Sequence, residues 1–228
     1  MDTQLIINNF FLVLEGLDET IILVLLSLSM GFFISIFFAL GRVLSIKLLS
    51  ESIYIYVFII RGTPLLVQIY LIYFGLGSIK IIRESIFWIL LKEPFWCGVI
   101  ALVLNTVAYT TEIIRGGIQS VTKGQIESCK SLGMSRLIMY YKIILPVAFR
   151  QAFPAYGNEM ILMVKATSLV SLTTYMEMTG IARNIMSQTF APVEAFIAAG
   201  VIYLFLNFLL VQLIKFLEWK YNPHLRLK

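Results

Sequence analysis

Two stretches of twenty residues, 21–40 (IILVLLSLSMGFFISIFFAL) and 195–214 (AFIAAGVIYLFLNFLLVQLI), contain no charged side chain. A helix needs about 20 mostly apolar residues to cross about 30 Å of hydrocarbon, so each stretch predicts a transmembrane helix. Composition supports this interpretation, because charged residues make up 14% of the chain, against about 25% in a typical soluble protein. The sequence therefore excludes a water-soluble globule and favours a membrane domain.

Three further segments have the length and apolar character of a span. Residues 53–79 contain only Arg61 as a charge, 95–111 contain none, and 160–176 contain only Lys165. The run 81–91 is too short and holds an Arg-Glu pair, so we expect it to lie along the membrane interface. The predicted fold is all-α, a polytopic membrane helix bundle with five transmembrane helices, formed by residues 1–228 as a single domain.

The basic residues are distributed unevenly between the two sides of this bundle. Five spans place four of the 18 Lys and Arg residues on the N-terminal side and twelve on the other side. Basic residues near span ends favour the cytoplasm, so we expect a periplasmic N-terminus and a cytoplasmic C-terminus. Residues 1–19 carry four acidic and no basic side chains, which is unlike a cleavable signal peptide. We expect the first span to remain in the mature protein.

Several function classes are disfavoured by the motifs the chain lacks. It contains no G-x-x-x-x-G-K-[ST], H-E-x-x-H or G-x-S-x-G pattern, so we expect neither an enzyme active site nor a bound metal. The net charge of +5 is explained by the cytoplasmic bias and by contact with anionic membrane lipid, without nucleic acid. Cys97 and Cys129 fall on opposite sides and are predicted to be free thiols, and His224 to be solvated.

The segment 115–154 is the longest polar-containing connection and is predicted to be cytoplasmic. Thr122 and Gln125 have the capping-box spacing that opens a helix, and Gly133 is suited to end it. Ser135 is then placed to cap a second helix running towards Pro146. Two interpretations of the first helix stay open: an amphipathic surface helix, or a helix inserted in a groove of a partner.

A resemblance to a known family lies in this same segment. Residues 127–133 (ESCKSLG), followed after nine residues by 143–146 (IILP), resemble the E-A-A-x-x-x-G-x(9)-I-x-L-P signature of membrane subunits of bacterial ABC importers. Ser128 and Cys129 stand where the family usually has alanines, but both are small. The resemblance implies a coupling helix that contacts a cytoplasmic ATPase subunit through Glu127, Ser128, Cys129 and Gly133.

Residues 61–65 (RGTPL), 108–113 (AYTTEI) and 158–171 are similar to the polar amino-acid branch of that family, and the match covers most of residues 15–220. The resemblance implies a multi-subunit importer in the bacterial inner membrane that works by alternating access. This chain would pair with a second membrane subunit, identical or related, and with an ATPase dimer and an external solute-binding protein. It would bind no cofactor itself, since ATP and Mg belong to the ATPase.

Charged and polar residues within the predicted spans are candidates for a substrate pathway, because a charge in mid-membrane is costly unless it serves a cavity or a partner. Lys165 either faces the path or is neutralised within the bundle. Arg61 precedes Pro64, whose missing N–H frees a carbonyl, so the site is either a functional helix break or a structural kink with a snorkelling Arg. The pathway candidates are Arg61, Asn158, Glu159, Lys165 and Ser168.

The resemblance also bears on the class of substrate. Residues 155–162 and 189–196 most resemble permeases for basic amino acids (histidine, lysine, arginine, ornithine) and opines. Glutamine, cystine or another polar amino acid is the alternative. A single-chain secondary transporter or channel is a distant one, because five spans without an internal repeat do not divide into two halves. A membrane assembly or receptor protein would not need an intramembrane lysine.

Overall fold

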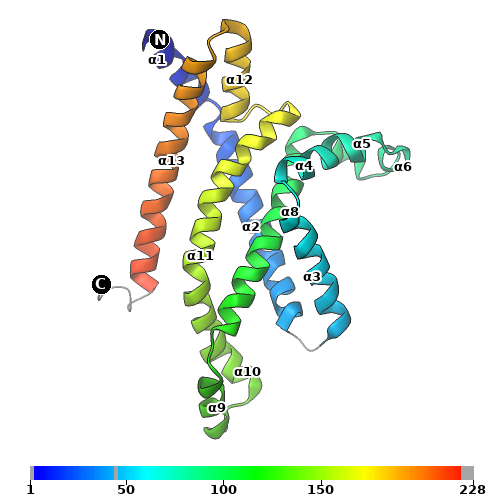
Figure 1. Cartoon of the computed structure of the whole chain (residues 1–228), viewed down its shortest axis with the longest axis vertical. Coiled ribbons are helices and arrows are strands. Elements are labelled where there is room, and N and C mark those ends of the chain that lie inside the picture. Colours follow the sequence, from blue (N-terminus) through cyan, green and yellow to red (C-terminus); the bar gives the residue numbers. More distant parts are fainter. Residues whose placement is uncertain (1–2, 44–45, 222–228) are drawn as a thin grey trace.

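The computed structural model describes residues 3–43 and 46–221, so His224 lies outside the described residues. Within these ranges every regular element is a helix, and the long helices form an elongated bundle with a lateral arm (Figure 1). The predicted all-α fold is confirmed. Three helices are long and apolar enough to cross a membrane: α2 (Leu17–Val43), α8 (Pro94–Gln119) and α13 (Pro192–Tyr221).

The helices α2 and α8 form the centre of the bundle, and a glycine sets their separation. A Cβ atom at Gly31 would lie 2.5 Å from Cγ2 of Thr106 on α8, closer than real contacts allow. Only glycine therefore permits this close approach of α2 and α8. Around this contact lies the main apolar core, which includes Leu28, Leu102 and Val107.

The second predicted span is not one straight helix. The helix α3 (Lys47–Gly62) ends at an extended Thr63, and the next helical segments, α4 (Leu65–Tyr70), the π-helix η1 (Leu71–Gly75) and α5 (Leu76–Ser78), run at 104° to it. The two parts are together apolar and long enough for one broken span, so the predicted span over 53–79 stays a prediction. The break follows from Pro64, because proline disfavours the helical region for the residue before it. Beyond the bend, α6 (Lys80–Arg83) and α7 (Trp88–Leu91) complete the arm seen in Figure 1.

The fourth predicted span also differs from expectation. The helix α11 (Leu145–Ala166) begins well before residue 160 and passes into the 3₁₀ helix η3 (Thr167–Thr173), which ends at Thr174 with φ 68°. Hydroxyl groups explain the tighter winding, since Thr167, Ser171 and Thr173 each donate to the carbonyl three residues earlier. Residues 160–176 therefore do not form one α-helix, and the count of five transmembrane helices stays a prediction.

The segment predicted as the cytoplasmic loop 115–154 is mostly helical. The helix α8 continues to Gln119, and α9 (Lys123–Ser131), α10 (Arg136–Met139) and the π-helix η2 (Tyr140–Ile144) lead directly into α11. Figure 1 places α9 and α10 at the lower end of the molecule, and the C-terminal part of α13 points in that direction. The helices α1 (Thr3–Leu14) and α12 (Met178–Thr189) lie at the upper end. The predicted sides of the membrane stay a prediction.

Candidate functional site

The helix α9, at one end of the bundle, begins with the predicted capping box. The Gln125 N–H donates to Oγ1 of Thr122 at 3.3 Å, and the Thr122 N–H donates to Oε1 of Gln125 at 3.0 Å. Ser135 caps the following helix by accepting from the Ile138 N–H at 3.4 Å. Both predicted helix starts are confirmed, and each uses donors that would otherwise lack a partner.

The helix α9 ends in a Schellman motif at Gly133. This glycine has φ 71°, its N–H donates to the Lys130 carbonyl at 2.9 Å, and the Met134 N–H donates to the Cys129 carbonyl at 3.1 Å. Among the described residues, no atom lies within 4 Å of the position a Cβ would take at Gly133. Backbone conformation, rather than crowding inside this chain, therefore calls for glycine here.

The four residues predicted to contact an ATPase subunit do not share one environment. Glu127, Ser128 and Gly133 are exposed, whereas Cys129 is 7% exposed and packs against the apolar cluster under α9. Cys129 thus anchors the helix to the bundle. Two apolar side chains that the sequence reasoning missed, Leu132 and Leu137, are 79% and 85% exposed.

A polar chamber of about 480 Å³ lies where the second predicted span is broken. One wall is the end of α3 and the extended residues after it, a second is α8, and the third is α11. The polar side chains and the break residues that line it are Arg61, Gly62, Thr63, Pro64, Asn105, Tyr109 and Glu159. The chamber combines an acidic, a basic, an amide and a phenolic group within largely apolar surroundings.

The break beside the chamber is held by Gln68. Its Nε2 donates to the Ile60 carbonyl at 2.7 Å, to the Thr63 carbonyl at 3.1 Å and to the Thr63 Oγ1 at 2.8 Å. Gln68 itself is 8% exposed, whereas Ile60 is half-buried and Thr63 is exposed, so these bonds are partly buried. The carbonyl groups left open at the end of α3 therefore find the donor that a membrane environment demands.

Opposite charges occupy different walls of the chamber. The Glu159 side chain on α11 is 5% exposed, and the Arg61 guanidinium lies 5.0 Å from the centre of the Tyr109 ring on α8. Within residues 3–43 and 46–221, neither charge is in an ion pair. A cation–π contact stabilises a guanidinium while leaving its N–H donors available. The chamber thus presents one carboxylate and one guanidinium to a bound molecule.

A second cavity of about 320 Å³ shares Arg61, Gly62 and Tyr109 with the chamber and extends it to Glu112. There Glu112 accepts from Arg115 at 2.6 Å and lies 3.6 Å from the Nε of Arg42 on α2. These charged side chains connect α2 to α8 at the far end of this second cavity. The polar surface therefore continues from mid-bundle towards the end that carries α9.

The structure brings together only two of the five predicted pathway residues. Arg61 and Glu159 line the chamber, whereas Asn158, Lys165 and Ser168 do not. Lys165 and Asn158 are exposed, and Ser168 donates its hydroxyl to the carbonyl of Lys165 at 2.6 Å. Asn105 and Tyr109 were not predicted to line the path, although their spacing of four residues puts them on one face of a helix.

A helical bundle with apolar spans, a polar chamber open on one side and a protruding capped helix is typical of a polytopic membrane transport protein. Residues 31–222 match the family described as "Binding-protein-dependent transport system inner membrane component", and the chain belongs to that family. It is an inner-membrane, multi-pass permease component of an ABC importer for amino-acid-like substrates, and is not itself catalytic. Membership implies ATPase subunits, a partner permease and a solute-binding protein.

Individual relatives agree with this assignment along nearly the whole chain. The nopaline transport system permease protein NocM of Agrobacterium fabrum is 48% identical over 227 residues, covering 99% of this chain and 94% of the relative. The histidine/lysine/arginine/ornithine permease HisM of Escherichia coli is 40% identical over 212 residues, covering 92% and 89%. A crystal structure of an amino acid ABC transporter with histidines aligns with TM-score 0.86 and 34% identity, covering 96% and 99%.

Proposed function

We propose that this chain imports an amino acid, or an amino-acid derivative, that carries both a cationic group and a carboxylate. The observation that carries this proposal is that Glu159 and Arg61 both line one chamber. The Glu159 carboxylate would hold the ammonium or guanidinium group, and Arg61 would hold the carboxylate through its fork of N–H donors. A basic amino acid or an opine has this combination of groups, and the similarity to nopaline and histidine/lysine/arginine/ornithine permeases supports it.

The position of Lys165 removes an objection to a cationic substrate. A lysine beside the substrate would repel it, but Lys165 is exposed and does not line the chamber. Asn105 and Tyr109 add a hydrogen-bonding amide and an aromatic face without adding charge. Glutamine, cystine or another neutral amino acid is the second candidate, since the α-amino and α-carboxylate groups of any amino acid could use the same pair.

The rest of the mechanism follows from the family. We infer that a second membrane subunit, identical or related, closes the open side of the chamber, and that an external binding protein delivers the substrate. A cytoplasmic ATPase dimer would receive α9 in a groove, contacting Glu127, Ser128 and the exposed apolar residues near Gly133. ATP and Mg would be used there, and this chain would hold no cofactor. Movement of α9 would pass through α8 and α11 to the chamber.

Transport by the reconstituted importer tests the proposal. In proteoliposomes with the ATPase and the binding protein, Glu159→Gln should lower uptake of a cationic substrate such as arginine. The loss should be about 10- to 100-fold, since a hydrogen bond to a charged group contributes about 1.5–3 kcal/mol. Uptake of glutamine should fall less. The matched control is Glu84→Gln on the lateral arm, where the carboxylate is 66% exposed and forms an ion pair with Lys80.

Two results would count against the proposal. Equal uptake by wild type and Glu159→Gln would show that the chamber carboxylate does not recognise the cation. An equal loss for arginine and glutamine would show that Glu159 does not distinguish a cationic side chain from a neutral one. Copurification of the ATPase with each variant distinguishes a transport defect from failed assembly.

A further inference from the structure

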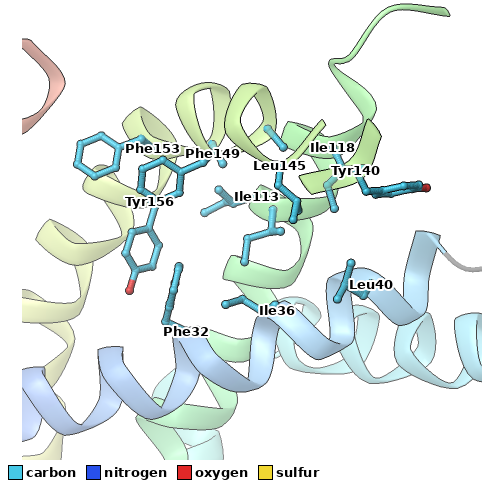
Figure 2. Close-up of a pocket in the computed structure, with 13 residues that line it drawn as sticks. Phe32, Ile36, Leu40, Ile113, Ile118, Tyr140, Leu145, Phe149, Phe153 and Tyr156 are labelled. Atoms are coloured by element: carbon cyan, nitrogen blue, oxygen red, sulfur yellow. The ribbon is translucent and has the colours of Figure 1, made fainter. Parts of the chain in front are cut away.

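An apolar hollow lies apart from the polar chamber in the described part of the chain. This apolar groove, of about 450 Å³, is formed by α2, α8 and α11. Figure 2 shows Phe32, Ile36 and Leu40 along α2 on one side and Phe149, Phe153 and Tyr156 on the other. Side chains of α8 lie between the two rows (Figure 2). Apart from two tyrosine hydroxyls, its surface is hydrocarbon, so a polar substrate has nothing to bind there.

The length of the apolar groove matches one leaflet of a membrane. Tyr156 closes its inner end against Phe32, with ring centres 5.1 Å apart, and Tyr140 lies at the opposite end (Figure 2). From Leu145 to Tyr156 the helix α11 rises about 16 Å at 1.5 Å per residue. Half of a 30 Å hydrocarbon core is about 15 Å. The groove therefore spans the depth that a single lipid chain occupies.

The chain near the Tyr140 end of the groove is basic. Residues 128–158, which supply Tyr140 and the whole α11 side of the groove, contain four Lys and Arg residues and no Asp or Glu. Two of the four, Arg136 and Lys142, flank Tyr140 in sequence and are exposed. On the predicted orientation they lie at the cytoplasmic surface, where basic residues attract anionic lipid head groups.

We propose that the apolar groove binds one acyl chain of an anionic phospholipid from the cytoplasmic leaflet, with its head group beside Arg136 and Lys142. This site is separate from substrate recognition and does not depend on it. Ile118 and Ala148 line the groove and also belong to the apolar cluster under α9. A bound acyl chain would therefore fill the space between α2 and the apolar cluster under α9.

Photolabelling of the complete importer tests this site. The complex is placed in nanodiscs of phosphatidylethanolamine containing phosphatidylglycerol with a photoreactive diazirine in its acyl chain, and labelled residues are identified by mass spectrometry. We expect labels on groove residues of α2 and α11. Ile36→Trp should fill the groove and lower that labelling several-fold. Ile34→Trp, two residues away on the exposed face of α2, is the matched control and should leave it unchanged.

The head-group contact has its own test. Arg136→Gln and Lys142→Gln should each lower groove labelling by phosphatidylglycerol about fivefold, whereas Lys215→Gln at the end of α13 should not. Equal labelling by the same probe built on phosphatidylethanolamine would overturn the anionic preference. Absence of groove labelling in the wild-type complex would overturn the site. Cysteine cross-linking of position 36 to the partner membrane subunit would show instead that protein covers the groove.

Discussion

Residues 122–134, which contain α9 and the turn at Gly133 and which we call the docking segment, are held by different interactions from those of the polar chamber. In the docking segment, the bonds that define α9 join residues three to five positions apart, such as Thr122 with Gln125 and Met134 with Cys129. In the chamber, Arg61, Asn105 and Glu159 come from three helices and are separated by more than forty residues. The first region is determined locally, and the second exists only when the bundle is assembled.

This difference teaches what each region should tolerate. A change in the docking segment should alter one helix end and its contact with the ATPase while the bundle stays intact. A change in the chamber should affect packing and transport together, because each wall also belongs to the core; Met163 lines the chamber and is 1% exposed. The predictions below test that separation.

The largest effect is expected at the break beside the chamber. Gln68→Leu keeps a similar volume but removes the donor shared by Ile60 and Thr63. Ile60 is half-buried and Thr63 is exposed, so the loss lies at the lower end of the range for an unpaired buried acceptor, about 1–3 kcal/mol. We expect transport in proteoliposomes to fall at least about tenfold and the thermal midpoint of the purified complex to drop, since 1.4 kcal/mol corresponds to a factor of ten.

The control for this variant is Gln212→Leu, an exposed glutamine on α13. It should leave both transport and thermal stability unchanged. If Gln68→Leu behaved like Gln212→Leu, the break would be held by Pro64 alone, and the chamber would be as locally determined as the docking segment.

A smaller and more selective effect is expected at Gly133. A residue with a Cβ in the left-handed region costs about 1–2 kcal/mol, while Asp tolerates that region better than Ala. If only backbone strain mattered, Gly133→Ala would be the more harmful change. We expect the reverse, with Gly133→Asp giving the greater loss of copurified ATPase, because its carboxylate is desolvated at the contact.

The control is Gly116→Asp, at an exposed glycine of α8 where a Cβ also meets open space. Insertion of the chain into the membrane should be normal for all three variants, measured as yield in the membrane fraction. Greater harm from Ala than from Asp would assign Gly133 to backbone geometry alone and leave α9 without evidence of a partner.

Sequence reasoning succeeded where the determinants are local. The capping box, the turn at Gly133 and the cap at Ser135 depend on neighbouring residues, and the structure has all three. Hydropathy alone was a poorer guide to helix geometry. The sequence placed a break or a kink at Pro64 but did not give its angle of 104°, and it did not show that residues 167–173 form a 3₁₀ helix.

The candidate site shows the same limit. Intramembrane charge selected two residues that line the chamber, but it also selected Lys165, which is exposed. Charge indicates that a residue needs an unusual environment, while the direction of its side chain depends on how α11 packs against its neighbours. Asn105 and Tyr109 were missed because a polar residue in a span more often forms a hydrogen bond to another helix than lines a cavity.

The smallest expected effect concerns the start of α9. Thr122→Ala removes the cap on the Gln125 N–H, which should destabilise the helix by about 1 kcal/mol. Gln125→Ala removes the reciprocal bond to the Thr122 N–H. Because both bonds belong to one motif, the double variant should cost less than the sum of the two single variants. Each single variant should lower ATPase copurification slightly, with substrate selectivity unchanged.

Additive losses would mean that the two bonds form independently. A changed preference between arginine and glutamine would mean that the docking segment and the chamber are not separable, and that a local change in α9 is transmitted along α8 and α11 to the substrate site.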